Sequence, residues 1–271
     1  MRSLLLAALL FSTPAFALDV TIGGKLEQGG LVIGTAPPGS SITVGERRVP
    51  AAADGTFFVG LGRNAPAALA VKIDTLAGET ETLSIAVARR DWKIDKVNGV
   101  PQNLVTPDPE TEARIAEDSK LLRAARARFE TQAFYRTGFI RPAEGRISGI
   151  YGSQRILNGE PRNVHAGLDI AAPTGTPIKA AADGVVTLAH PTMVMSGGTV
   201  LLNHGYGLQT SYIHMSRIDV ADGQRVKQGD VIGAIGATGR VTGPHLHFSV
   251  LWFDTSLDPD TILALLPAAK D

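Results

Sequence analysis

The chain contains no cysteine among its 271 residues, and this absence excludes disulfides, thiolate nucleophiles, Cys-ligated zinc and iron–sulfur clusters. It also lacks an excess of either charge, because 26 Lys and Arg balance 26 Asp and Glu. Nucleic-acid-binding proteins normally carry a basic excess, so this balance argues against that class. Aromatic residues make up only 6%, whereas 30 glycines and many β-branched residues favour strands and tight turns over a helical bundle. The length corresponds to one large domain or two small ones.

Long apolar runs are absent too. The first residues hold only a short one, from Leu4 to Phe11, well below the ~20 apolar residues that span a bilayer. Arg2 precedes this run and the A-x-A triplet Ala15-Phe16-Ala17 follows it, as in a secretory signal. We therefore expect a signal peptide over residues 1–17, export to the periplasm or cell wall, and no transmembrane segment. An uncleaved N-terminal anchor is the alternative.

No histidine occurs before His165, so the first part of the chain offers no imidazole for catalysis. Residues 18–95 alternate apolar and polar side chains between Gly, Pro and Asn turns, which predicts a small antiparallel β-sandwich with an accessory role. Pro109 then begins a charged run with helical spacing, with Asp108 as its expected cap. We expect a solvated helical linker over residues 96–140. Residues 141–271 form the third predicted unit, which is again rich in strand patterns.

All the chemistry-bearing imidazoles lie in this third unit. His165 and Asp169 are four residues apart in a predicted strand over 163–170, so both side chains are expected on one face. His245 and His247 are two apart in another predicted strand, where they again share a face. Three of these four side chains would supply a His₂Asp set suited to Zn²⁺, with the fourth coordination position left for water.

The fourth member of this set suits proton transfer and oxyanion stabilisation, and His214 on another predicted strand is a further candidate. On spacing alone, each histidine has a second interpretation, as a hydrogen-bonded surface or core residue. His190 and His204 fit no ligand position, and we expect His204 to be a turn residue. Asn163 is expected to position the turn or strand before His165.

The segment from about Gly149 to Pro259 resembles the lysostaphin-type zinc peptidases, whose catalytic module is often called the LytM domain. The similarity rests on five motifs in the family's order: HAGLDIAAPTGTP (165–177), ADGVV (182–186), YIHMS (212–216), VKQGDVIG (226–233) and GATGRVTGPHLHF (236–248). The resemblance implies an antiparallel β catalytic domain, and hence a mostly β protein made of a β-sandwich, a helical linker and this domain.

The resemblance also implies that His165, Asp169 and His247 bind Zn²⁺. It further implies that His245 is the general base and that His214 stabilises the oxyanion or exchanges protons with it. Family members cleave peptide cross-links in bacterial peptidoglycan. The segment RILNGEPR (155–162) is similar to exported Gram-negative members with an N-terminal β domain, for which the expected substrate is the D-alanyl–diaminopimelate cross-link.

Other functions are weighed against this one. The sequence contains no G-x-S-x-G elbow, which argues against a serine hydrolase, and no H-E-x-x-H, which excludes a thermolysin-type site. It also has no Lys on an exposed tight turn of the kind that a lipoyl-type carrier needs. The non-enzymatic alternative is an activator or scaffold of a cell-wall amidase, since LytM-type modules that have lost ligands serve in this way. A regulatory protein partner and self-inhibition by the N-terminal domain remain open. Tyr151 has an uncertain equivalence to a family tyrosine and is left outside the catalytic set.

Overall fold

The computed structural model describes residues 18–97, 109–157, 160–161 and 164–268. The predicted signal peptide, the cap at Asp108 and the role of Asn163 therefore lie outside the described residues. In the described part, no helix is both long and apolar enough to cross a membrane.

The N-terminal domain consists of two small antiparallel sheets, as the alternating pattern predicts. One sheet has the order β1-β2-β5 and the other the order β4-β3-β6-β7. Their strands are β1 (Thr21–Gly24), β2 (Leu31–Thr35), β3 (Ser41–Val44), β4 (Arg47–Pro50), β5 (Thr56–Gly60), β6 (Ala68–Asp74) and β7 (Thr80–Ala86). Fully buried side chains such as Leu31, Ile42, Phe57 and Ile73 fill the space between them.

The catalytic-type domain is built on one large sheet with the strand order β17-β14-β15-β16-β19-β12-β9. The strands of this domain are β9 (Arg146–Gly149), β12 (Leu168–Ala171), β13 (Pro177–Lys179), β14 (Gly184–Met193), β15 (Gly197–Gly205), β16 (Leu208–Ile218), β17 (Arg225–Val226), β18 (Val231–Ile235), β19 (Leu246–Trp252) and β20 (Thr255–Leu257). The sheet confirms the predicted mostly β class, and β19 next to β12 places the two predicted ligand segments side by side.

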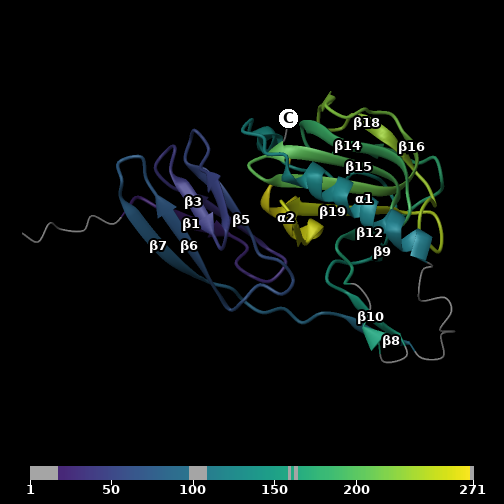
Figure 1. The fold of residues 1–271 in the computed structure, drawn as a ribbon, viewed down its shortest axis with the longest axis horizontal. Coiled ribbons are helices and arrows are strands. Elements are labelled where there is room, and N and C mark those ends of the chain that lie inside the picture. Colours follow the sequence, from purple (N-terminus) through teal and green to yellow (C-terminus); the bar gives the residue numbers. More distant parts are fainter. Residues whose placement is uncertain (1–17, 98–108, 158–159, 162–163, 269–271) are drawn as a thin grey trace, which may run out of the picture.

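A three-stranded arm projects away from both domains, below the large sheet in the view of Figure 1. Its strands are β8 (Ile94–Val97), β10 (Gln154–Leu157) and β11 (Glu160–Pro161), and β8 runs parallel to β10. The arm therefore joins the chain leaving the N-terminal domain to the segment that precedes His165.

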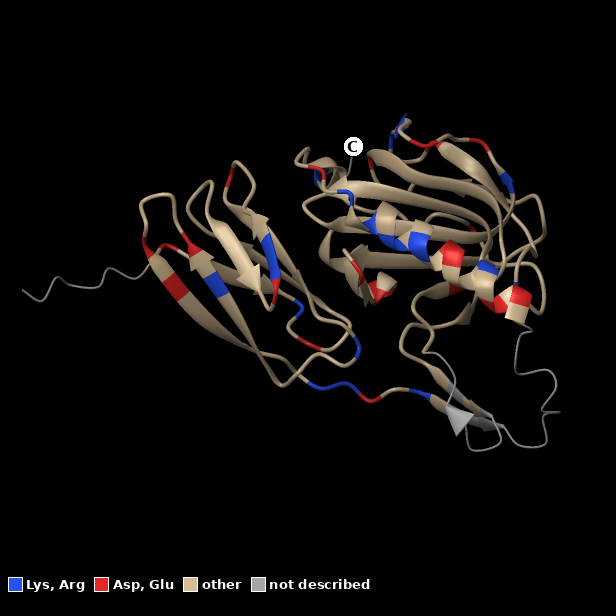
Figure 2. Ribbon diagram, viewed as in Figure 1, with Lys and Arg blue, Asp and Glu red and all other residues tan. Residues whose placement is uncertain are grey.

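The helix α1 (Pro109–Ala127) lies against the large sheet and is more than a solvated linker (Figure 1). Asp118 accepts a hydrogen bond from the backbone N–H of Val194, and Ala125 is buried. Just beyond the helix, the carbonyl of Arg128 accepts a bond from the side chain of Asn203. Charged residues of both signs occupy the outward side of α1 (Figure 2). The charge pattern in the sequence thus identifies the exposed face of α1, but it does not show that the opposite face packs against the large sheet.

Two short helices complete the fold: η2 (Phe134–Thr137) and α2 (Pro259–Leu265). The sequence reading placed only strands after residue 141, so α2 is a correction. Asp258 caps it by accepting a bond from the N–H of Asp260, and Pro259 stands at its first position. The same Asp258 pairs with Arg90 of the N-terminal domain at 2.8 Å, which ties α2 to that domain.

Candidate metal centre

Three side chains converge where β12 meets β19. Asp169 and His247 are direct cross-strand partners in the antiparallel pair, which brings the Oδ1 of Asp169 to 2.8 Å from the Nδ1 of His247. The Nε2 of His165 lies 2.9 Å from that oxygen and 3.0 Å from that nitrogen. The structure thus brings together the three residues named as metal ligands from the sequence, each through one donor atom.

The reason for their proximity differs from the one predicted. The strand β12 begins only at Leu168, so His165 precedes it and the four-residue spacing along a strand does not apply. His165 is instead held by backbone hydrogen bonds to Gly152 and Ser153, at 2.9 and 2.8 Å. Gly167 lies between His165 and Asp169 and has to be small, because a Cβ there would lie 2.3 Å from the carbonyl oxygen of Phe248.

The outer ring nitrogens show which atoms face the centre. The Nδ1 of His165 lies 2.8 Å from the carbonyl oxygen of Ile150, which can only accept, so this nitrogen carries the proton. A neutral His165 therefore presents a bare lone pair at Nε2. The Nε2 of His247 lies 3.0 Å from the Oγ of Ser249, which leaves its Nδ1 to face Asp169.

The resulting donor set fits a zinc ion. Two imidazole nitrogens and one carboxylate oxygen are ordinary zinc ligands, and their lone pairs repel one another at these distances unless a cation or proton lies between them. Each outer nitrogen has an oxygen partner, which is the usual support for metal-bound histidines. The side chains of His165, Asp169 and His247 keep 21, 20 and 14% of their exposure, so the cluster remains open on one side to a further ligand.

Burial and charge act in opposite directions at this cluster. Burial alone raises the pKa of Asp169, but the nearby ring nitrogens of His165 and His247 outweigh it and hold this pKa well below its usual range. Burial lowers the pKa of His247, which favours its neutral form. A neutral imidazole and an ionised carboxylate are the forms that bind a metal.

Two further histidines face the cluster. The Nε2 of His245 lies 3.8 Å from the Oδ1 of Asp169, while its Nδ1 lies 2.9 Å from the carbonyl oxygen of Gly243. The ring of His214 lies 4.9 Å from that of His245 and 6.3 Å from that of His247, between centroids. The five residues singled out from the sequence are therefore assembled in one place.

His214 owes its orientation to an irregular stretch of β16. Its φ is +66°, an uncommon value for a residue with a side chain, and the pairing of β16 with β15 and β18 shifts register around it. The Nδ1–H of His214 donates to the carbonyl oxygen of Thr238 at 2.9 Å, and burial lowers its pKa to about 4. His214 is therefore a neutral imidazole near pH 7, and the lone pair on its Nε2 can accept a proton or a hydrogen bond.

The other candidates lie elsewhere. Tyr151 is buried and its hydroxyl donates to the carbonyl of Ser256 at 2.8 Å. This hydrogen bond gives the phenol a structural role away from the cluster. His190 lies in β14, paired with Thr199 of β15. The expectation for His204 is wrong, because it lies in β15 and is fully buried, with its ring nitrogens 2.6 Å from the carbonyl of Asp183 and 2.7 Å from the Oγ1 of Thr210.

Sequence reasoning also missed the groups that orient these rings. Ser249 had a detectable signal, because it continues the alternation of His245 and His247 along β19. The carbonyls of Ile150 and Thr238 had none, since any residue supplies a backbone oxygen and only the fold places it.

Comparison with known proteins agrees with this geometry. Residues 163–259 match the model of peptidase family M23. The chain is 41% identical over 119 residues to the peptidoglycan DD-endopeptidase ShyC of Vibrio cholerae, which is 43% of this chain and 27% of that protein. It is 47% identical over 103 residues to the DD-carboxypeptidase/endopeptidase Mpg of Neisseria gonorrhoeae, which is 38% of this chain and 24% of that protein. The chain thus spans about a quarter of the length of these relatives.

Similarity in structure extends beyond the matched segment. A crystal structure from Pseudomonas aeruginosa that carries the name peptidase M23 superposes with a TM-score of 0.69 and is 28% identical in sequence. The match covers 89% of this chain and 96% of that one, so it includes most of the N-terminal domain as well.

Proposed function

We propose that this chain is a zinc-dependent endopeptidase that hydrolyses peptide cross-links in bacterial peptidoglycan, because residues 163–259 match peptidase family M23 and a similar protein is named a peptidoglycan DD-endopeptidase. The observation that carries the proposal is the convergence of His165, Asp169 and His247 beside two further imidazoles. The names of the ShyC and Mpg relatives support peptidoglycan as the substrate. The finer assignment to the D-alanyl–diaminopimelate cross-link rests on the RILNGEPR segment and is part of the proposal.

The three converging residues would hold the ion. Two neutral imidazoles and one carboxylate leave a net charge of +1 on a zinc complex, and such an ion acts as a Lewis acid that acidifies water and polarises a carbonyl. Ile150 and Ser249 hold the rings of His165 and His247 in the orientation that this requires.

His245 is the general base in this proposal. The carbonyl of Gly243 accepts from its Nδ1–H, which leaves a lone pair on the Nε2, 3.8 Å from the Oδ1 of Asp169. It can therefore take a proton from the attacking water and later donate one to the leaving amine.

His214 has a different starting state. Its Nδ1–H is committed to Thr238, so the neutral ring offers an acceptor at Nε2 and can donate to an oxyanion only after it has gained a proton. This supports proton exchange between His214 and the reacting groups, with oxyanion stabilisation following from the protonated form.

Export belongs to the same proposal. The pattern of residues 1–17 is that of a secretory signal, and peptidoglycan lies outside the cytoplasmic membrane. The N-terminal domain contacts the rest of the chain at two places: Arg47 pairs with Asp254, just beyond β19, at 2.6 Å, and Arg63 donates to the carbonyl of Gly152 at 2.8 Å.

The test is digestion of purified, cross-linked peptidoglycan by the mature zinc-loaded protein, with the released muropeptides identified by mass spectrometry. Conversion of cross-linked dimers to monomers, abolished by a chelator, is expected and identifies the bond. His247→Ala should lose both zinc and turnover, and a variant that kept both would refute the assignment. No conversion by a zinc-bound protein would favour the alternative of a non-catalytic activator of a cell-wall amidase.

A further inference from the structure

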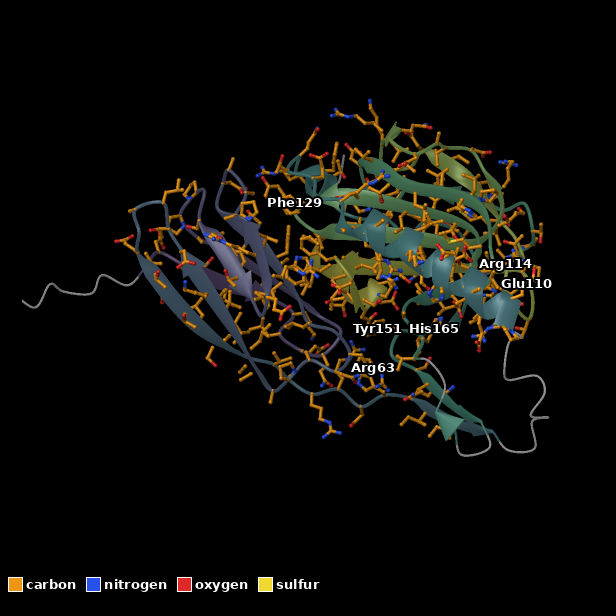
Figure 3. The ribbon with its side chains drawn as sticks, in the orientation of Figure 1. Arg63, Glu110, Arg114, Phe129, Tyr151 and His165 are labelled. Atoms are coloured by element: carbon orange, nitrogen blue, oxygen red, sulfur yellow. The ribbon has the colours of Figure 1, made fainter. Side chains whose placement is uncertain are left out.

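A cavity with a volume of about 560 Å³ lies between the N-terminal domain and the arm. Among the residues that line it are Gln28, Arg63, Arg89, Arg90, Trp92 and Gln154. Its volume falls within the range of pockets that enclose small ligands or single groups of larger ones. Figure 3 shows Arg63 of the N-terminal domain close to Tyr151 and His165 of the catalytic-type domain.

The cavity carries positive charge that the described part of the protein does not neutralise. Arg90 is paired with Asp258 at 2.8 Å, but neither Arg63 nor Arg89 has a carboxylate partner among the described residues. The lining contains one acidic residue in this part of the chain, Asp91. A second interdomain cavity, of about 510 Å³, differs in this respect, because its Arg47 is already paired with Asp254.

Two of the three guanidinium groups, those of Arg63 and Arg90, are held in place before any ligand arrives. Those of Arg63 and Arg90 lie over the indole of Trp92, with their carbons 5.3 and 4.6 Å from the ring centroid. Arg63 donates from Nε to the carbonyl of Gly152 at 2.8 Å and from Nη1 to Asn64, which leaves further N–H donors for a ligand. Rigid, planar donors of this kind suit a carboxylate, which accepts two parallel hydrogen bonds.

The cavity adjoins the metal centre along the backbone. Gln154 of its lining directly follows Ser153, whose carbonyl accepts a bond from the N–H of His165. One residue along a strand and one step between strands together span ~8 Å. An extended peptide covers that distance in about three residues.

We propose that this Arg63–Arg89 cavity binds a free carboxylate of the peptidoglycan stem peptide while the scissile bond lies at the metal centre. The inference rests on the proposed function for the identity of the ligand. It assigns to the N-terminal domain part of the substrate site, because Arg63 and Arg89 both come from the segment before the arm. The site would select free acids over amidated stem peptides.

The test compares a soluble cross-linked muropeptide with its carboxamidated counterpart on the full-length zinc-loaded protein. Amidation should raise KM about tenfold at nearly constant kcat, which is the effect of losing one hydrogen bond between ionised groups. Arg89→Gln should raise KM for the free acid by a similar factor and become insensitive to amidation. Arg89→Lys should recover part of the difference, and Arg48→Gln, on β4 of the same domain but outside the lining, should behave as the unaltered protein.

Calorimetry of the metal-free protein with the uncrosslinked stem peptide separates this inference from the proposed function. Binding of the free acid that is weakened in Arg89→Gln supports the cavity even if no bond is cleaved. Equal binding and equal KM values for both peptides would overturn the inference and leave the peptidase assignment intact. Discrimination that persists in Arg89→Gln would also overturn it, because the carboxylate would then bind elsewhere.

Discussion

Ser249 lies two residues beyond His247 on β19, and its Oγ is 3.0 Å from the Nε2 of His247. Replacing Ser249 with alanine removes this partner but keeps the ligand itself. We expect Ser249→Ala to bind zinc 10–100-fold more weakly, the range observed when a partner of a metal ligand is removed, as measured by chelator competition. Ser211→Ala is the matched control, because Ser211 faces Ser249 from β16 without a bond to His247 among the described contacts. Equal affinities would show that Ser249 does not orient the ring.

His245 can be separated from the ligands by substitution. His245→Gln should keep its zinc content, since His165, Asp169 and His247 remain, but turnover should fall by about 10²–10⁴, the usual contribution of a positioned acid or base. Zinc content by elemental analysis and kcat on one muropeptide provide the two measurements. Loss of zinc in this variant would assign His245 to the ligand set instead.

Gly149 faces Asp169 across the pair of β9 and β12. A Cβ at this position would lie 2.3 Å from the Oδ2 of Asp169 and 3.1 Å from the Cε1 of His165, so Gly149→Ala should displace the carboxylate. We expect at least a tenfold loss of zinc affinity, which corresponds to about 1.4 kcal/mol. Gly243→Ala is the control, because a Cβ there meets nothing within 4 Å. Unchanged affinity in Gly149→Ala would mean that Asp169 is not needed for the metal.

The sequence predicts the sandwich and names the five side chains that the fold brings together, but it does not predict how they are held. Alternation along β19 correctly puts Leu246 and Phe248 in the core, because strand periodicity is local information. The position of His165 ahead of β12 depends on its pairing with Ser153, a tertiary contact that no periodicity reports. The helix α2 had a readable start in Asp258-Pro259, whereas the packing of α1 depends on tertiary contacts such as the bond between Asp118 and the N–H of Val194.

His204 predicts a pH dependence of stability. Burial lowers its pKa in the folded protein to about 4, against 6.5 in the unfolded chain. Between these values the unfolded chain binds the additional proton, so stability falls as the pH drops from 6.5 towards 4. In urea unfolding of the metal-free protein, the free energy of unfolding should fall between about pH 7.5 and 4.5 by about 3 kcal/mol more than it falls in His204→Gln. Parallel curves for the two proteins would contradict this assignment.

The contacts of α1 predict which fragment can fold. Its removal would leave the buried side chains of Asn203 and Gln209 without the carbonyls of Arg128 and Arg126. Each unpaired buried amide costs about 1–3 kcal/mol, so a fragment of residues 141–271 should melt well below one of residues 109–271. Calorimetric scans of both fragments measure the difference. Equal melting temperatures would show that α1 is dispensable, as a free linker would be.

The parallel pairing of β8 with β10 joins segments about sixty residues apart in the chain. Such a pair can close only after the intervening chain has folded, because its loop-closure entropy must be offset by contacts formed earlier. The arm is therefore expected to close last in folding and to open first in unfolding. Since Ser153 directly precedes β10 and accepts a bond from the N–H of His165, we expect the metal centre to assemble only once the arm has closed.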